Sequence, residues 1–144
     1  MKLDDIEDLW GKDSEIDSTE LGNEATKIPK LHHKYYQIFI KERMLLRSYE
    51  AEMKKLKLDK YEFYSQGHNE YTKEKGWELP ARGMIIKTDI PMHLDADKDI
   101  ISLSLKIGMQ FEKVEYLESI IKSLTNRGYL IKSHIDFLKW SSGN

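Results

Sequence analysis

The chain has 144 residues, of which 40% are hydrophobic and 33% are charged, and a formal net charge of -2, which suits one domain with an apolar core and a large exposed surface. The absence of cysteine excludes a disulfide framework and thiolate metal sites, and it fits a reducing compartment. The acidic first segment lacks the apolar stretch of a secretory signal, and no apolar run approaches the ~20 residues that span a bilayer, so we expect a cytosolic protein.

Charge is segregated along the chain. Residues 1–25 hold nine acidic residues and two lysines, whereas residues 26–60 hold ten Lys or Arg residues and four acidic ones. An acidic arm beside a basic segment is typical of proteins that bind partners. The two segments could equally neutralise each other within the fold.

The first predicted element is a short amphipathic helix over residues 2–10. Gly11 ends it, and its apolar residues fall on one side: Leu3, Ile6, Leu9 and Trp10. The sequence DSTE at 17–20 resembles a capping box, which predicts a second helix. Pro29 should interrupt that helix, because proline lacks a backbone donor and clashes with the preceding turn.

A long basic helix is predicted over residues 29–64. Its heptad-like apolar positions are Leu31, Tyr35, Ile38, Leu45, Tyr49 and Leu56. The next segment, residues 66–95, is rich in glycine and proline and should be irregular. Within it, the alternation of Ile86, Thr88 and Ile90 indicates one short strand over residues 84–90.

The remaining chain predicts helices over residues 97–127 and 129–140, separated by a C-cap at Asn126-Arg127-Gly128. The fold class is therefore mainly α, in a single domain. The apolar stripe of these helices is wider than one helix partner needs, so we expect part of it to contact other subunits. The candidate oligomerisation residues are Ile107, Val114, Leu117, Ile121, Leu124, Ile131, Ile135 and Leu138.

Motifs for enzymatic chemistry are missing. The glycines are scattered and form no phosphate-binding loop, and neither GxSxG nor HExxH occurs, so we expect no enzyme activity and no cofactor. The sequence DADKD at 95–99 imitates half of a calcium loop, but Ile100 stands where that loop needs glycine, and helix capping explains it better. The neighbouring His32 and His33 point about 100° apart on a helix, which argues against a shared metal.

A basic and aromatic run, KKLKLDKYEFYSQG at 54–67, is the main candidate site. Single-stranded nucleic acid requires cations for its phosphates and flat faces for its unpaired bases. The candidate nucleic-acid-binding residues are Lys54, Lys55, Lys57, Lys60, Tyr61, Phe63 and Tyr64, with Lys41, Arg43 and Arg47 as secondary candidates. The competing interpretation is a solvated lysine face beside aromatic residues that belong to the core.

Four stretches, in this order and spacing, resemble the UvsY family of phage recombination mediators. They are IDSTEL with the following EA within 16–25, KKLKLDKYEFYSQG at 54–67, ADKDIISLSLKI at 96–107 and NRGYLIKSHIDFLKW at 126–140. The resemblance covers most of the chain and is weakest at 68–94. The last stretch is its most specific part.

This resemblance implies an accessory factor that binds single-stranded DNA and forms a ring of identical subunits, hexameric or heptameric. Such a factor loads a RecA-like recombinase of the UvsX type onto DNA covered by the phage single-stranded-DNA-binding protein, in the host cytoplasm. The family's basic residues precede an aromatic-aromatic-Ser motif, here Phe63-Tyr64-Ser65. Lys60 occupies the nearer basic position, whereas Leu58 occupies the other, a departure for which the adjacent Lys57 could substitute.

Two other functions remain open at this point. The chain could be a purely structural helical oligomer whose lysines only keep it in solution. It could instead be an adaptor that binds a protein through its acidic arm and never contacts DNA.

Overall fold

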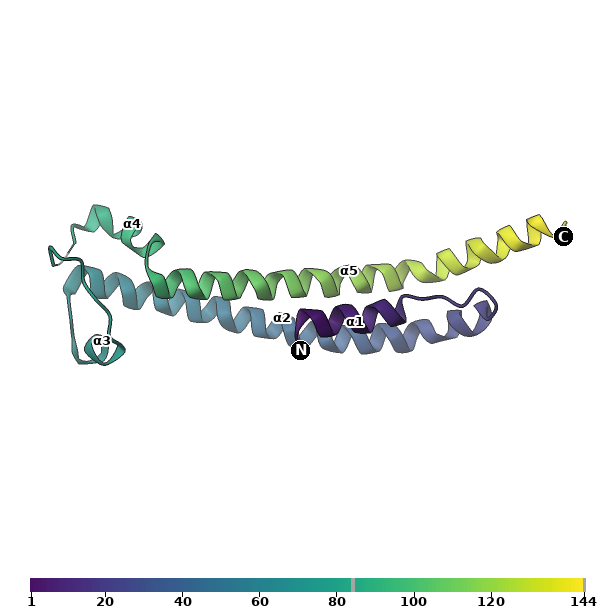
Figure 1. Cartoon of the computed structure of the whole chain (residues 1–144), viewed down its shortest axis with the longest axis horizontal. Coiled ribbons are helices and arrows are strands. Elements are labelled where there is room, and N and C mark those ends of the chain that lie inside the picture. Colours follow the sequence, from purple (N-terminus) through teal and green to yellow (C-terminus); the bar gives the residue numbers. More distant parts are fainter. Residues whose placement is uncertain (84, 144) are drawn as a thin grey trace. The chain divides into compact units, whose positions relative to one another are not determined.

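The computed structural model describes residues 1–83 and 85–143, and these residues form helices and connecting loops without a β-strand (Figure 1). The elements are α1 (Leu3–Asp13), α2 (Leu21–Gln66), α3 (Glu70–Lys75), a 3₁₀ turn η1 (Lys87–Asp89), α4 (Ile90–Asp95) and α5 (Lys98–Ser141). The mainly α fold class is therefore confirmed. None of the helices in this described part is long and apolar enough to cross a membrane.

The chain divides into two compact units, and both long helices contribute to each. Unit 1 comprises Met1–Met44 with Phe111–Asn144, and unit 2 comprises Leu45–Gln110.

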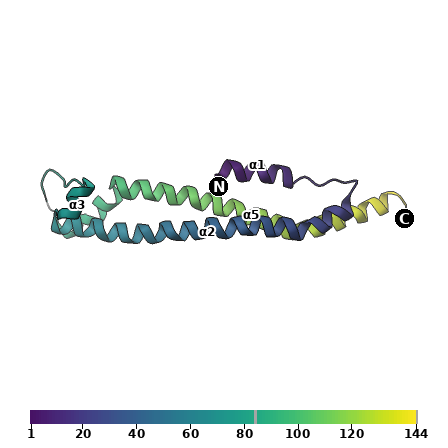
Figure 2. The ribbon, with the colours of Figure 1, turned by 90° about the horizontal axis from the view of Figure 1, so that it is seen from below.

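In unit 1, the chain reverses direction after α1, so that α1 and the first part of α2 run antiparallel (Figures 1 and 2). Ile6 of α1 and Tyr35 of α2 are both 0% exposed. The Trp10 ring meets the Tyr35 ring edge-on at a centroid distance of 5.4 Å, and the Tyr35 hydroxyl donates to Asp13 Oδ2 at 2.8 Å. The apolar side of the predicted first helix is thus the side that packs.

The second half of α5 completes the core of unit 1. Val114, Leu117, Leu124 and Ile131 are buried at helical spacing, and Leu117 and Leu124 are 0% exposed. Because these residues are buried within the single chain, their helical spacing is explained by packing inside one subunit.

Pro29 does not interrupt the second helix, contrary to the sequence-based expectation, because α2 continues through it from Leu21 to Gln66. A proline within a helix costs about 3 kcal/mol through its lost hydrogen bond and its ring clash. Contacts on both sides offset this cost. Glu24 is paired with Arg127 before the proline, and Tyr35 is packed against α1 after it.

The expected break at Asn126-Arg127-Gly128 is also wrong, since α5 is one continuous helix. Gly128 lies close to α2, where a Cβ would be 4.0 Å from Ile28 Cδ1. Arg127 is buried, with 4% exposure. The polar pattern that imitates a helix end marks a position where α5 packs closely within unit 1.

Unit 2 contains the end of α2, the short elements and the start of α5. A buried cluster of Phe63, Tyr64, Trp77 and Ile90 forms its centre. The short strand predicted over 84–90 is not found among the described residues of that range, and Met84 lies outside them. Residues Lys87–Asp89 form the 3₁₀ turn, and Ile90 begins α4. A lone strand would leave its backbone groups unpaired, whereas Ile90 gains full burial in the cluster.

Candidate nucleic-acid interface

The basic run at the end of α2 presents three different faces. Lys54, Lys57 and Tyr61 follow i, i+3, i+7 spacing and share an outer face, on which Tyr61 is 40% exposed. A second face, with Lys55, lines a groove described below. The third face holds Lys60, Phe63 and Tyr64 and is buried, with exposures of 2%, 2% and 7%.

Lys60 is the most unusual member of the run, because its ammonium group lies in the interior of unit 2. Lys60 Nζ is 2.8 Å from Asp99 Oδ2 and 3.1 Å from Asp97 Oδ2. It also lies 3.9 Å from the centroid of the Trp77 ring, within the range of a cation–π contact. Two carboxylates and an aromatic face therefore replace the water that the charge loses.

Asp97 links this cation to the start of α5. Its Oδ1 accepts from the backbone N–H groups of Asp99 at 2.9 Å and Ile100 at 3.1 Å, so it caps the helix. Its Oδ2 accepts from the Tyr64 hydroxyl at 2.6 Å. Burial alone would raise the pKa of Asp97, but the hydrogen bonds from Tyr64, the Ile100 amide and Lys60 outweigh it and lower the pKa. Burial, with the bond to Asp97, raises the pKa of Tyr64.

The interpretation of KKLKLDKYEFYSQG as one exposed surface therefore needs correction. Phe63 and Tyr64 belong to the core, and the Phe63 ring packs edge-on against Trp77 at 5.5 Å. In this conformation neither ring can stack a base, and Lys60 can reach a phosphate only if its ion pairs open. Lys54, Lys55, Lys57 and Tyr61 remain exposed.

The secondary candidates differ in their surroundings. In unit 1, Lys41 is exposed, whereas Arg43 is half-buried with its guanidinium carbon 4.9 Å from the Phe39 ring centroid. In unit 2, Arg47 is exposed. Lys41 and Arg47 are thus accessible to a ligand, and Arg43 also has a packing role.

Sequence reasoning missed three residues of this site: Trp77, Asp97 and Asp99. The sequence indicates only a helix-capping role for the two aspartates and does not place them beside Lys60. The only available signal was indirect, a cluster of carboxylates at a helix start together with a lone tryptophan in an irregular segment.

The candidate oligomerisation residues fall into two groups. Most are at least half-buried inside the subunit: Ile107, Val114, Leu117, Ile121, Leu124, Ile131 and Ile135. Leu138 is 43% exposed. The large exposed apolar side chains of α5 in unit 1 lie mainly near its C-terminal end: Tyr129, Leu130, Phe137, Leu138 and Trp140. We call these five residues the C-terminal patch.

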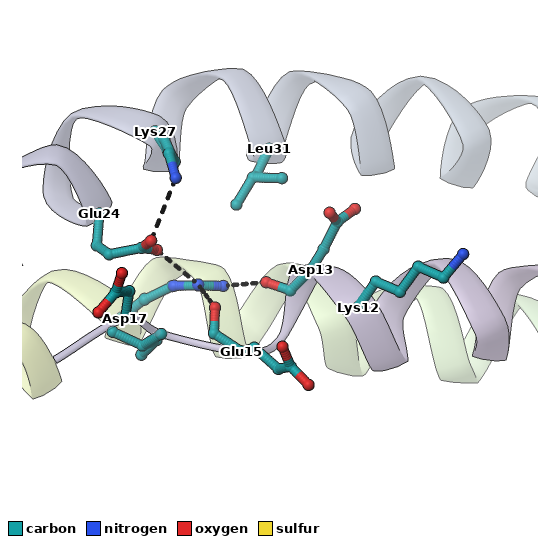
Figure 3. A pocket seen from close by; sticks show the side chains of 9 residues that line it. Lys12, Asp13, Glu15, Asp17, Glu24, Lys27 and Leu31 are labelled. Carbon is teal, nitrogen blue, oxygen red and sulfur yellow. Dashed lines mark hydrogen bonds and ion pairs between the residues drawn. The ribbon is translucent and has the colours of Figure 1, made fainter. Parts of the chain in front are cut away.

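A second buried cation, Arg127, joins three segments of unit 1. Its Nη1 donates to the Asp13 carbonyl at 2.7 Å, and its Nη2 donates to the Glu15 carbonyl at 2.9 Å and lies 3.4 Å from Glu24 Oε2. Figure 3 shows Glu24 and Lys27 of α2 facing the end of α1 at Asp13 and the connection that carries Glu15. The adjoining cavity of about 470 Å³ has lining residues of both charges, and the arginine holds the acidic arm in place.

Together, the long helices and the exposed lysines with Tyr61 define a helical protein in which α2 has a basic end. Its fold is that of crystal structures of the bacteriophage T4 recombination mediator protein UvsY. One lattice form matches with a TM-score of 0.79 and 23% identity over 99% of this chain and 98% of that chain. Another matches with a TM-score of 0.77 and 20% identity over 98% and 99%. A third matches with a TM-score of 0.77 and 23% identity over 95% and 98%.

The family itself is shown by a sequence model described as "Recombination, repair and ssDNA binding protein UvsY", which matches residues 9–144. This chain belongs to the UvsY family. The resemblance carried by the four sequence stretches is thereby confirmed. No curated protein matches the chain.

Proposed function

We propose that this protein is a recombination mediator, which binds single-stranded DNA and helps to load a RecA-like recombinase of the UvsX type. The DNA would already be coated by the phage single-stranded-DNA-binding protein. The whole chain would act as one mediator domain in the host cytoplasm, without catalysing a reaction itself. The observation that carries the proposal is the exposed row of Lys54, Lys57 and Tyr61 in a member of this family.

The charge on this row suits a DNA backbone. Lys54 and Lys57 of the row, and Lys55 on the neighbouring face, form no ion pair with a carboxylate among residues 1–83 and 85–143, so their charges are available to phosphates. Tyr61 adds an aromatic face beside them, and stacking on such a face is typically worth ~1–3 kcal/mol per base. The buried side of the same helix end supports this surface, because its side chains pack in unit 2 and fix the end of α2: Lys60, Phe63 and Tyr64.

We also propose that the mediator is a ring of identical subunits, hexameric or heptameric as the family resemblance implies. The C-terminal patch is the surface that supports this proposal, because Tyr129 is 74% exposed and Trp140 is 77% exposed. Large apolar side chains that are exposed together near one helix end favour an interaction site. Linking several weak basic sites in one assembly can raise the affinity for a long strand by ~10²–10⁴.

Fluorescence anisotropy with labelled oligo-dT tests the DNA-binding part. We expect binding that weakens as salt rises, because cations released from the strand drive it. A purely structural oligomer would give no signal. An adaptor would bind the recombinase but not the oligonucleotide, which a pull-down of each partner distinguishes.

Loading is tested by order of addition. Recombinase is added to single-stranded DNA already coated by the single-stranded-DNA-binding protein, and its DNA-dependent ATP hydrolysis is followed with and without the mediator. We expect the mediator to shorten the lag and to hydrolyse no ATP alone. ATP turnover that copurifies with this chain would contradict the accessory role.

A further inference from the structure

Unit 2 contains a groove of about 380 Å³ beside the basic run, on a different face of α2 from Lys54 and Tyr61. Three segments line it. The end of α2 contributes Glu52, Lys55, Leu56 and Asp59, the region of α3 contributes Tyr71, Lys75, Gly76 and Trp77, and the start of α5 contributes Lys98 and Asp99.

We propose that this groove holds one nucleotide of a single-stranded DNA, with the base against Tyr71 and the flanking phosphates near Lys55, Lys75 and Lys98. The inference rests on the proposed DNA binding and adds a site to it. It also assigns a binding role to three residues outside the basic run: Tyr71, Lys75 and Lys98.

Tyr71 is the aromatic residue available in the groove. Its side chain is 48% exposed, and its ring meets Trp77 edge-on at 6.0 Å, with an angle of 85° between the rings. Lys75 lies 5.5 Å from the Tyr71 ring centroid. This ammonium lies over the ring, so a base that stacks on this side of Tyr71 would displace it, and the flexible lysine could then contact a flanking phosphate.

The charges of the groove favour a nucleotide over a simple phosphate. Three exposed lysines line it, and none of them is paired with a carboxylate in the described part of the chain. Asp99 shares the Lys60 cation with Asp97, which reduces its charge. Glu52 and Asp59 are the lining carboxylates without an ion pair in the described part of the chain. A free phosphate would be repelled by these two carboxylates, whereas the amino group of a base can donate hydrogen bonds to them.

The wall of the groove is held by contacts that do not involve a ligand. Trp77 is fixed by the Lys60 cation at 3.9 Å and by the Phe63 ring at 5.5 Å. The start of α3 is fixed by the Asn69 side chain, which accepts from the Thr72 amide at 2.9 Å. Gly76 ends α3 with a φ of 71°, a left-handed conformation that favours glycine. A preformed wall lowers the ordering cost of binding.

The test uses the full-length protein, a short labelled oligo-dC, whose bases carry an amino group, and anisotropy over a range of salt concentrations. Tyr71→Leu should bind about 5- to 150-fold more weakly, the loss expected when one base loses its aromatic platform. The slope of log K against log salt should not change, because no phosphate contact is removed. Tyr71→Phe should keep the parental affinity, since it keeps the ring face.

Lys98→Gln gives an independent readout, because an exposed lysine has little effect on folding. Its salt slope should fall in magnitude by about 0.7, the contribution of one phosphate contact on a single strand. Lys87→Gln is the matched control, since Lys87 is exposed in the same unit and does not line the groove. Circular dichroism checks that every variant folds.

Two outcomes overturn the inference in distinguishable ways. If the parent binds DNA while Tyr71→Leu keeps its affinity and Lys98→Gln keeps its salt slope, the groove is not a DNA site and the proposed function survives. If the parent does not bind single-stranded DNA at all, the proposed function fails and the groove assignment fails with it.

Discussion

Lys60 Nζ and Asp99 Oδ2 lie 2.8 Å apart in unit 2, although Lys60 belongs to a lysine run whose other members are exposed. This ion pair separates the run into one buried, structural lysine and three lysines that remain exposed to solvent. Substitution of Lys60 should therefore lower stability, whereas substitution of Lys57, three residues earlier, should affect stability little.

Lys60→Ala should destabilise the protein by about 3–5 kcal/mol, because Asp97 would remain buried without its cation. Urea denaturation followed by circular dichroism measures this loss. Lys57→Ala is the control and should change stability by at most about 0.5 kcal/mol, as is usual for an exposed residue. A Lys60→Ala variant that folds like the parent but binds DNA weakly would instead identify Lys60 as a phosphate contact.

The double substitution Lys54→Ala with Lys57→Ala should weaken DNA binding without loss of helicity. Each removed phosphate contact should reduce the magnitude of the salt slope by about 0.7 per occupied subunit. Anisotropy titrations at several salt concentrations provide both the affinity and the slope. Parental binding by this variant would move the interface to other cations, with Lys41 and Arg47 as the next exposed candidates.

Acid should destabilise unit 2 through Asp97. Its pKa is lowered in the folded state from an ordinary value of 3.8, so its contribution is present above that value and is lost as pH falls toward the folded-state pKa. Thermal unfolding measured from pH 6 downward should show this loss. Asp97→Asn should flatten this part of the profile, whereas Asp136→Asn, at an exposed position of α5, should not.

Assembly should depend on the C-terminal patch. Phe137→Ser with Trp140→Ser should sediment as a smaller species with unchanged helicity, because both side chains are mainly exposed in the subunit, at 56% and 77%. If the double variant sediments at the same size as the parent at the same concentration, the C-terminal patch is not needed for assembly.

Leu117→Ala provides the contrasting case for the same helix. Leu117 is 0% exposed within the subunit, so its truncation should lower the free energy of unfolding by about 2–5 kcal/mol. Denaturation of the protein at low concentration, where assembly contributes least, measures the subunit's own loss. If the variant dissociates but keeps the parental free energy of unfolding, Leu117 contributes to the oligomer interface and not to the subunit core.

Helical periodicity anticipated the elements of this fold more successfully than their ends. The apolar spacing of Ile6, Tyr35, Leu117 and Leu124 identified residues that are buried. Local breaker signals failed at Pro29 and Gly128, because packing within unit 1 outweighs the cost of one lost hydrogen bond or one flexible residue. The alternating isoleucines of 84–90 failed for a related reason, since Ile90 is buried in a cluster of side chains and not in a sheet.

The sequence by itself determined the helical class, the family and the place where positive charge gathers, because periodicity, motif order and composition are properties of the chain alone. Only the tertiary structure decided which members of the basic run face solvent. Lys57 and Lys60 look alike in sequence, yet only Lys60 is buried. Its ammonium group pairs with Asp99, which lies 39 residues further along the chain. The reason is physical: burial of a charge depends on partners brought together by folding, and short-range sequence patterns do not contain those partners.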